Sequence, residues 1–378
     1  MAKHRIAWMP GDGIGVEVMD AARTVLDAVG FEADYVPAEI GWELWRTEGN
    51  PLPDRTLRVL KSTDAALFGA ITSLPKEEAE DALVPELKGK GLVYRSPIVR
   101  LRQEFNLRTN RRPCFAFPGN PLNHREGIDI VVFRENTEGM YAGVEFHPVP
   151  DEVRAALRAH SAPMRKFDAT AAGDMAITCR IITRGGATNI IRDAFEHAKA
   201  YDYPSVTIVE KPNVLRETSG LMIRVAREVA KQYPGIELWE TNIDAMTMWL
   251  IKNPEQYGVL VCSNLFGDVI SDLCAQLVGG LGFAASGNIG DDYAVFEPTH
   301  GSAPKYAGMN KVNPCATILS AEMMLDWLGE KELAARVRRA VAEVIAQGRV
   351  RTYDMGGKST TTEMAGVIAE KARVGAPL

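Results

Sequence analysis

The sequence predicts an α/β fold in which helices cover a largely parallel central sheet. Short apolar segments typical of buried strands alternate with longer segments whose apolar residues recur at helical spacing. This alternation extends through most of the 378 residues. A chain of this length is expected to form two domains, or one large core with an insertion.

The predicted strands are short runs rich in Val, Ile, Leu, Ala and Phe, in chain order 4–9, 64–71, 128–136, 205–211 and 257–264. The predicted helices are 15–30, 187–201, 219–233 and 331–348. The first helix repeats apolar residues at helical spacing and ends at Gly30, because glycine readily adopts the left-handed conformation that follows many helices.

Residues 145–180 break this alternation. The segment has two early prolines, followed by polar and strand-like fragments without a clear period. An irregular excursion of this length in a compact domain is usually functional or interfacial. We therefore expect an arm that pairs with another subunit.

Composition narrows the function classes. The net charge of −6 argues against a binder of nucleic acid or anionic membranes, which needs a basic surface. The five cysteines are dispersed without a CxxC pair, which is typical of reduced thiols in a cytoplasmic protein. The first apolar run is too short for a signal peptide, and no run approaches the ~20 residues of a membrane span.

The first loop, "PGDGIG", resembles a dinucleotide-binding fingerprint without matching it. Its glycines are Gly11, Gly13 and Gly15, whereas the Rossmann pattern is GxGxxG. Asp12 lies inside the loop, where its carboxylate would repel a pyrophosphate. Two interpretations remain open: a tight strand-to-helix turn, or a loop beside a cofactor in a fold that is not Rossmann.

Two aspartates form the first candidate site. Asp268 and Asp272 are four residues apart, so a helix would place both carboxylates on one face. Adjacent like charges are destabilising unless a cation lies between them, and Asp244 could supply a third oxygen. Carboxylates without Cys or His suit Mg²⁺ or Mn²⁺. The alternative is a solvated helix face.

Arginines form the second candidate site. Arg102, Arg112 and Arg134 come from three segments that a folded sheet could bring together, and guanidinium groups bind carboxylates bidentately. Tyr141 and Lys211 near such a site would make an acid/base pair. The alternative is that each arginine is solvated or salt-bridged and the tyrosine merely packed.

The third candidate site is the loop 296–314, "FEPTHGSAPKYAGMNKVNP". It offers His300, Lys305, Tyr306 and Asn313 to a polar ligand, and its backbone N–H groups could hold a phosphate or a nucleotide base. The alternative is a turn-rich loop without a ligand.

The segments "FRENTEGMYAG", "NLFGDVISD" and "EPTHGSAPKYAG" occur in an order that resembles the β-decarboxylating isocitrate and isopropylmalate dehydrogenases. The resemblance runs from "GDGIG" to "GGKSTTTEM", which is nearly the whole chain. It implies an isocitrate/isopropylmalate dehydrogenase-like open α/β sheet that is not a Rossmann fold. It also implies a large cofactor-binding domain (1–107 and 279–378) and a small domain (108–278) whose clasp, at about 145–180, builds a homodimer.

The resemblance also implies residue roles. Asp268 and Asp272 would bind Mg²⁺ or Mn²⁺ together with Asp244 of the partner subunit. In NAD(P)-dependent oxidative decarboxylation, Tyr141 would be the acid, and Lys211 of the partner subunit would be the base. The malate carboxylates would be bound by Arg102, Arg112 and Arg134. The adenosine end of the cofactor would be bound by His300, Gly301, Ser302, Ala303 and Asn313.

The segment "SPIV" (96–99), where the family's substrate preference is largely set, departs from the "SLN" of isocitrate enzymes. Ser96 is retained, whereas Ile98 cannot hydrogen-bond a third carboxylate. "SPIV" is similar to some homoisocitrate dehydrogenases, so isocitrate and homoisocitrate rank first. Isopropylmalate, tartrate, malate or a phosphonate analogue are alternatives. Arg108 and Arg111 stand where many relatives have aromatic or apolar residues. Arg108 is expected on the same strand face as Arg112 and could bind a further anionic group of the substrate. The alternative is that it lies at the surface or forms an intersubunit salt bridge.

The residues expected to select the cofactor also point in two directions. Lys305, Tyr306, Val312 and Tyr353 resemble the pattern of NADP-dependent members, whereas Gly357 stands where NADP-dependent isocitrate enzymes have an arginine. We therefore expect NADP as the preferred cofactor, with NAD as the alternative. A non-catalytic regulatory subunit is disfavoured because the predicted catalytic and metal-binding residues are all present. The loop at 296–314 argues against a hydrolase or lyase that uses no nicotinamide.

Overall fold

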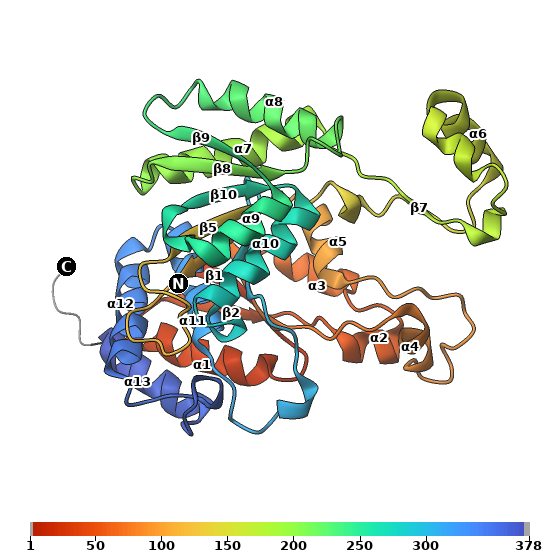
Figure 1. Cartoon of the computed structure of the whole chain (residues 1–378). Helices are drawn as coiled ribbons and strands as arrows, with labels where there is room; N and C mark the ends of the chain where they lie inside the picture. The colour runs from red at the N-terminus through yellow and green to blue at the C-terminus, as the bar shows by residue number, and fades with distance from the viewer. Residues whose placement is uncertain (1–2, 374–378) are drawn as a thin grey trace.

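The computed structural model describes residues 3–373 and is built on one ten-stranded sheet (Figure 1). The strands lie in the order β2 (Ala33–Pro37), β1 (His4–Gly11), β3 (Ala65–Ala70), β12 (Ala294–Pro298), β11 (Ala285–Ile289), β4 (Thr109–Phe115), β5 (Asp129–Glu135), β10 (Val259–Cys262), β8 (Ser205–Glu210) and β9 (Glu237–Asn242). The α/β prediction is confirmed.

The sheet is mixed rather than uniformly parallel. β11 runs antiparallel to both of its neighbours, β12 and β4, and β4 runs antiparallel to β5. The strands on either side of this central strip are parallel, with β5, β10, β8 and β9 forming one parallel set. The carboxyl ends of β5, β10 and β8 therefore meet at one edge, where α/β folds usually place their ligands.

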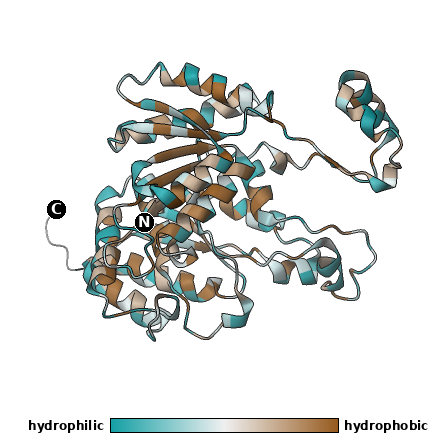
Figure 2. Cartoon of the chain, in the orientation of Figure 1, coloured by the Kyte–Doolittle hydropathy of each residue, from teal (hydrophilic) through white to brown (hydrophobic). Residues whose placement is uncertain are grey.

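Helices cover both faces of the sheet. They are α1 (Gly15–Val29), α2 (Trp42–Glu48), α3 (Asp54–Leu60), α4 (Lys76–Asp81), α5 (Pro97–Glu104), α6 (Asp151–His160), α7 (Arg184–Ala200), α8 (Thr218–Ala230), α9 (Ile243–Lys252), α10 (Asn264–Leu277), α11 (Cys315–Trp327), α12 (Lys331–Gln347) and α13 (Thr361–Arg373). α1, α11, α12 and α13 pack on one end of the sheet, and α7 and α8 pack on β5, β8 and β10. α9 and α10 cover the other face of β5 and β10. The buried strands are accordingly the hydrophobic centre of the molecule (Figure 2).

The predicted arm contains more regular structure than its sequence indicates. β6 (Glu145–Phe146) pairs antiparallel with β7 (Ile177–Thr178), and α6 lies between them, away from the rest of the chain (Figure 1). The expectation of an irregular segment is therefore wrong for Asp151–His160. No residue of α6 is buried in this chain, yet Val153, Ala156 and Leu157 recur at helical spacing, so its sequence carries a periodic signal that the sequence analysis did not use.

The two-domain division stays a prediction. Across the sheet, the first five strands (β2, β1, β3, β12 and β11) come from residues 1–107 and 279–378. The other five strands (β4, β5, β10, β8 and β9) come from residues 108–278. No helix within residues 3–373 is long and apolar enough to cross a membrane.

Candidate active site

The first loop is a tight turn packed against the loop at 300. Gly13 has a φ of +54°, and a Cβ added there would lie 2.2 Å from the carbonyl oxygen of Ser302. Asp12 faces inward, where its carboxylate accepts hydrogen bonds from the backbone N–H of Trp42 (2.8 Å) and Thr72 (2.9 Å). Burial raises the pKa of Asp12 despite these bonds. Asp12 therefore links the first loop to the backbone at Trp42 and at Thr72.

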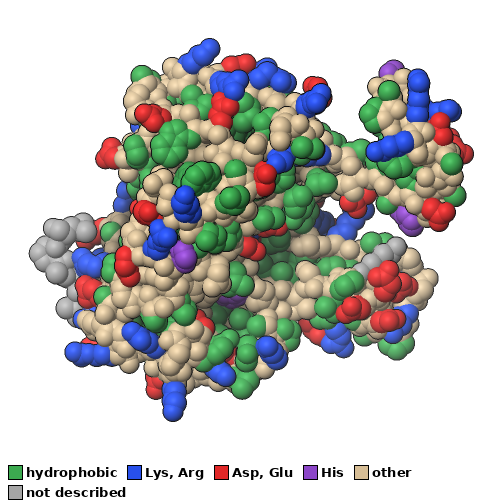
Figure 3. Space-filling model, viewed as in Figure 1, with side chains coloured by type: hydrophobic (Ala, Val, Ile, Leu, Met, Phe, Trp, Pro, Cys, Tyr) green, Lys and Arg blue, Asp and Glu red, His purple; other side chains and the backbone are tan. Residues whose placement is uncertain are grey.

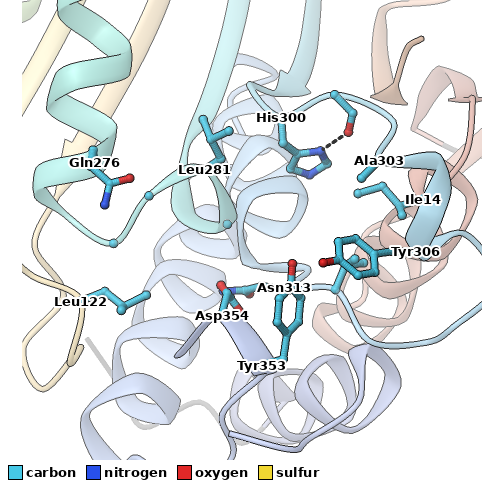
Figure 4. A pocket seen from close by; sticks show the side chains of 15 residues that line it. Ile14, Leu122, Gln276, Leu281, His300, Ala303, Tyr306, Asn313, Tyr353 and Asp354 are labelled. Atoms are coloured by element: carbon cyan, nitrogen blue, oxygen red, sulfur yellow. Dashed lines mark hydrogen bonds between the residues drawn. The ribbon is translucent and has the colours of Figure 1, made fainter. Parts of the chain in front are cut away.

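A cavity of about 520 Å³ opens beside this turn (Figure 4). Ile14, at the end of the turn, lies in its wall, so the turn is both tightly packed and adjacent to the cavity. The predicted cofactor residues that line the cavity are His300, Gly301, Ala303, Tyr306, Val312, Asn313 and Tyr353. The sequence did not indicate the other walls, which include Gln276, Leu281 and Asp354.

His300 offers this cavity an unused hydrogen-bonding atom. Its Nδ1 lies 3.0 Å from the carbonyl oxygen of Gly301, and its buried Nε2 has no hydrogen-bond partner within residues 3–373. Burial lowers the pKa of His300, which keeps the imidazole neutral near pH 7. A neutral ring with one open nitrogen fits a polar ligand such as a nucleotide.

Two of the predicted cofactor residues lie outside the cavity wall. Ser302 is buried, with its hydroxyl 2.5 Å from that of Thr72, and its carbonyl accepts the N–H of Ile14. Lys305 is exposed at the rim, where its Nζ lies 4.9 Å from the ring centroid of Tyr306.

The predicted arginines and aspartates meet at the start of α10. Arg134, at the end of β5, donates to Asn264 (2.8 and 3.1 Å) and to Asp268. Arg112 of β4 donates to Asp272 (3.0 Å), and its Nη1 lies 3.6 Å from Asp268. Burial, with the nearby charge of Arg112, lowers the pKa of Arg134 to about 10. The helix does place both carboxylates together, and guanidinium groups supply the neighbouring positive charge.

Tyr141 joins the same cluster. Its hydroxyl donates to Asp268 over 2.7 Å, and its ring lies 5.1 Å from the Arg134 guanidinium carbon. Burial and this hydrogen bond raise the pKa of Tyr141. The phenol therefore keeps its proton at neutral pH, as a general acid must.

Arg102 approaches the cluster from α5. It donates to Asn288 (3.0 Å), and its Nη2 lies 3.8 Å from Glu297. A second cavity of about 170 Å³ lies between Arg102, Arg112 and the side chain of Ile98. This cavity shares His300 and Gly301 with the larger one, so the arginine site and the loop at 300 adjoin. Ser96 lies at the N-cap of α5 and lines neither cavity.

Lys211 and Asp244 form a separate pair. Lys211 follows β8, Asp244 lies in the first turn of α9, and the two side chains hydrogen-bond each other. This bond lowers the pKa of Asp244, whose side chain is 66% exposed. Within residues 3–373, no group of three His, Cys, Asp or Glu side chains is placed to hold a metal ion. Asp244 therefore does not form one three-carboxylate group with Asp268 and Asp272 in the described part of the chain.

The carboxylates of Asp268 and Asp272 fit a hard divalent cation. Asp268 and Asp272 present adjacent carboxylate oxygens on one helix face, with side chains 31% and 61% exposed. Oxygen-only ligands are those that Mg²⁺ and Mn²⁺ prefer.

Sequence reasoning missed a buried network behind Lys211. Arg180, at the base of the arm, donates to Glu210 (2.9 Å) and to Ser263 (2.7 Å), the N-cap residue of α10. The Ser219 hydroxyl also donates to Glu210 and accepts the backbone N–H of Lys211. No local motif marks this network, because its members lie far apart in the chain.

The hypothesis that Arg108 shares a face with Arg112 is wrong. Arg108 precedes β4, so strand alternation does not apply to it, and its guanidinium lies 2.6 Å from Asp291 and 3.7 Å from Asp193 of α7. Arg111 points to the same side as α7 and lies 3.8 Å from Asp326. These arginines form salt bridges within the chain, away from the arginine–aspartate cluster.

A sequence profile described as isocitrate/isopropylmalate dehydrogenase matches residues 5–368. The chain belongs to this family. Its members are β-decarboxylating dehydrogenases of 3-substituted malates that use NAD(P) and a divalent metal. The chain is thus an enzyme of the decarboxylating dehydrogenase class, and its sequence resemblance is confirmed.

Individual relatives cover the chain almost completely. Protein DlpA of Legionella pneumophila is 39% identical over 97% of this chain, which spans only 58% of that protein. The isocitrate/homoisocitrate dehydrogenase of Thermus thermophilus is 41% identical, covering 97% of this chain and 98% of the relative. The 3-isopropylmalate dehydrogenase of Methanothermobacter thermautotrophicus is 39% identical, covering 98% of each.

The fold has a close counterpart among solved structures. The crystal structure of isocitrate dehydrogenase from Methylococcus capsulatus superposes with a TM-score of 0.84 at 39% identity, covering 98% of this chain and 99% of that one. The expectation of an isocitrate/isopropylmalate dehydrogenase-like sheet is thereby confirmed.

Proposed function

We propose that this enzyme oxidatively decarboxylates isocitrate or homoisocitrate to a 2-oxo acid and CO₂, with NADP⁺ as the preferred oxidant. The observation that carries this proposal is the placement of three arginines: Arg102 and Arg112 line one small cavity, and Arg112 and Arg134 both lie beside Asp268. Three guanidinium groups beside a carboxylate pair suit a polycarboxylate substrate, because each can form charge-assisted hydrogen bonds to a carboxylate.

The chain's own residues have distinct tasks in this reaction. The arginines bind and orient the carboxylates, and their charges stabilise the negative charge that develops after CO₂ leaves. Lys211 of the partner subunit accepts the proton of the C2 hydroxyl, and Tyr141 later donates its proton to C3. Asp268 and Asp272 would hold the divalent metal ion, which would supply Lewis-acid polarisation of the C2 oxygen, and the loop at 300 would hold the nicotinamide cofactor, which would supply the hydride acceptor.

Two features support a homodimer with shared active sites. Lys211 and Asp244 pair with each other at the surface rather than joining Asp268 and Asp272. The outer face of α9 and α10 also exposes apolar side chains, including Met248 (73% exposed), Trp249, Ile251 and Val269 (Figure 3). A second copy docked on this face would cover the apolar surface and bring Lys211 toward the other copy's aspartates.

Hybrid dimers test this sharing. Lys211→Met and Asp268→Asn are each expected to abolish activity alone. Co-expressed subunits carrying one substitution each should regain activity, because one site of every hybrid dimer would contain both native residues. Lack of any regained activity in a purified hybrid dimer would refute shared sites.

A substrate panel tests the reaction itself. Isocitrate, homoisocitrate, isopropylmalate, malate, tartrate and a phosphonate analogue are assayed with Mn²⁺ and either NADP⁺ or NAD⁺. The highest kcat/KM is expected for isocitrate or homoisocitrate with NADP⁺. No reduction of either dinucleotide by any panel member would favour a regulatory subunit instead.

Isopropylmalate is the second candidate because of the wall opposite the arginines. Phe68, Ile71 and Ile98 line the small cavity and would contact an apolar substituent on C3. Ile98→Asn should then separate the candidates. It would raise kcat/KM for isocitrate relative to isopropylmalate, since an amide can hydrogen-bond a third carboxylate.

A further inference from the structure

One buried carboxylate joins two helices beside the candidate active site. Glu210 ends β8, directly before Lys211, and its side chain is fully buried. Its Oε1 atom accepts the backbone N–H of Ser263 (3.1 Å). Its Oε2 atom accepts hydrogen bonds from the Arg180 guanidinium (2.9 Å) and from the Ser219 hydroxyl. The carboxylate therefore ties the start of α10 to the start of α8.

The α8 side of this network reaches the backbone of Lys211. The Ser219 hydroxyl donates to Glu210, and its oxygen accepts the N–H of Lys211 (3.2 Å). The carbonyl oxygen of Lys211 accepts the N–H of Leu215 (2.8 Å). The main chain of Lys211 is therefore held from the interior, whereas its ammonium group pairs with the exposed carboxylate of Asp244.

The α10 side of the network reaches the aspartates. Ser263 is the N-cap residue of α10, and its hydroxyl accepts a hydrogen bond from Arg180 (2.7 Å). Asp268 and Asp272 follow on the same helix. Hydrogen bonds to charged groups are stronger than those between neutral groups, so Glu210 and Arg180 hold the first residue of this helix firmly.

We propose that Ser219 is a positioning residue for the general base, because it fixes the main chain of Lys211 against the Glu210 carboxylate. This inference rests on the proposed sharing of active sites between two subunits. In that arrangement Lys211 serves the aspartates of the partner subunit. Ser219 therefore acts on the partner's site and not on the site that contains Asp268 of its own chain. A displacement of about 1 Å in a reacting group costs about a hundredfold in rate.

Two hybrid dimers that carry the same two substitutions test the inference. In the first, Ser219→Ala and Asp268→Asn lie in one subunit, and the other subunit is native. Its surviving site uses native aspartates together with Lys211 of the Ser219→Ala subunit, so kcat should fall about ten- to hundredfold. In the second, the two substitutions lie in different subunits. Its surviving site receives Lys211 from a subunit with native Ser219, so kcat should equal that of an Asp268→Asn/wild-type hybrid.

The remaining kinetic constants separate positioning of the base from damage to the binding site. Both hybrids keep native arginines and a native Asp268–Asp272 pair in the surviving site. The KM of the substrate and the Kd of Mn²⁺ should therefore stay within about twofold of the Asp268→Asn/wild-type hybrid, with the loss confined to kcat.

A second buried serine provides the matched control. Ser205 lies at the start of β8, at the opposite end of the strand from Glu210. Ser205→Ala, placed in the same two arrangements with Asp268→Asn, should leave kcat unchanged in both.

The comparison between the two hybrids decides the outcome. Equal kcat values for both Ser219→Ala hybrids, or a lower kcat in the second, would overturn the inference, because a general loss of stability affects both hybrids alike. Failure of Lys211→Met and Asp268→Asn subunits to regain activity together would instead refute the shared sites themselves.

Discussion

Replacing Arg180 with methionine is expected to destabilise the fold strongly, because it leaves a buried carboxylate without its cation. The Glu210 side chain is fully buried and that of Arg180 is 11% exposed. Arg180 also donates to Thr218 (2.7 Å), Ser219 (3.1 Å) and Ser263. Breaking one side of a buried ion pair costs about 3–5 kcal/mol, so Arg180→Met should lower the free energy of unfolding by about that amount.

The double variant provides the decisive comparison. Arg180→Met with Glu210→Gln removes both charges, so it should cost clearly less than the sum of the two single changes. A coupling energy of about 2 kcal/mol or more is expected for groups in direct contact. Urea unfolding at one fixed protein concentration measures all four proteins, since assembly would otherwise change the apparent stability.

An exposed ion pair from the same region serves as the control. Arg184 and Glu228 have side chains 58% and 56% exposed, so Arg184→Met should change stability by no more than about 1 kcal/mol. Equal effects of Arg180→Met and Arg184→Met, or strict additivity in the Arg180–Glu210 cycle, would refute the reasoning.

Three further changes give separate readouts. Burial raises the pKa of Glu322 to about 7 from its usual 4.5, so the native protein loses stability as the pH rises through this interval. Glu322→Gln cannot ionise and should gain about 2–3 kcal/mol over wild type between pH 5 and 8, measured by urea unfolding; a pH-independent difference would contradict this assignment. Gly13→Ala should cost about 2 kcal/mol or more through its contact with Ser302, whereas Gly366→Ala, inside α13 with open space, should be neutral or stabilising. Tyr141→Phe should lower kcat at least about a hundredfold with little change in KM, and a kcat within tenfold of wild type would exclude its role as the acid.

The predictability of each strand follows from its burial. β3, β8 and β10 lie between parallel neighbours, and β5 lies between antiparallel β4 and parallel β10. All four are covered on both faces, so their sequences are nearly continuous apolar runs. β4 has the sequence TNRRPCF, in which Asn110 and Arg112 face one side and Arg111 the other. Its charged residues are satisfied by distant partners, so no apolar run marks it as a strand.

The candidate site was predictable where its residues lie in compact motifs. Asp268 and Asp272 share one helix, and the loop at 300 supplies six of the residues that line the larger cavity. Arg180 was missed because its significance depends on which distant residues the fold brings beside it. Arg108 was misplaced for the same reason, since its partners Asp193 and Asp291 lie far away in sequence.

The contact between Gly13 and Ser302 lies one residue from Ile14, Gly301 and Ala303, which line the larger cavity. Main chain meets main chain at this contact, and the Asp12 carboxylate holds the turn against the backbone of Trp42 and Thr72, so a side chain at position 13 meets a steric barrier. A glycine at position 13 is therefore expected to persist through evolution while side chains elsewhere in the cavity wall diverge.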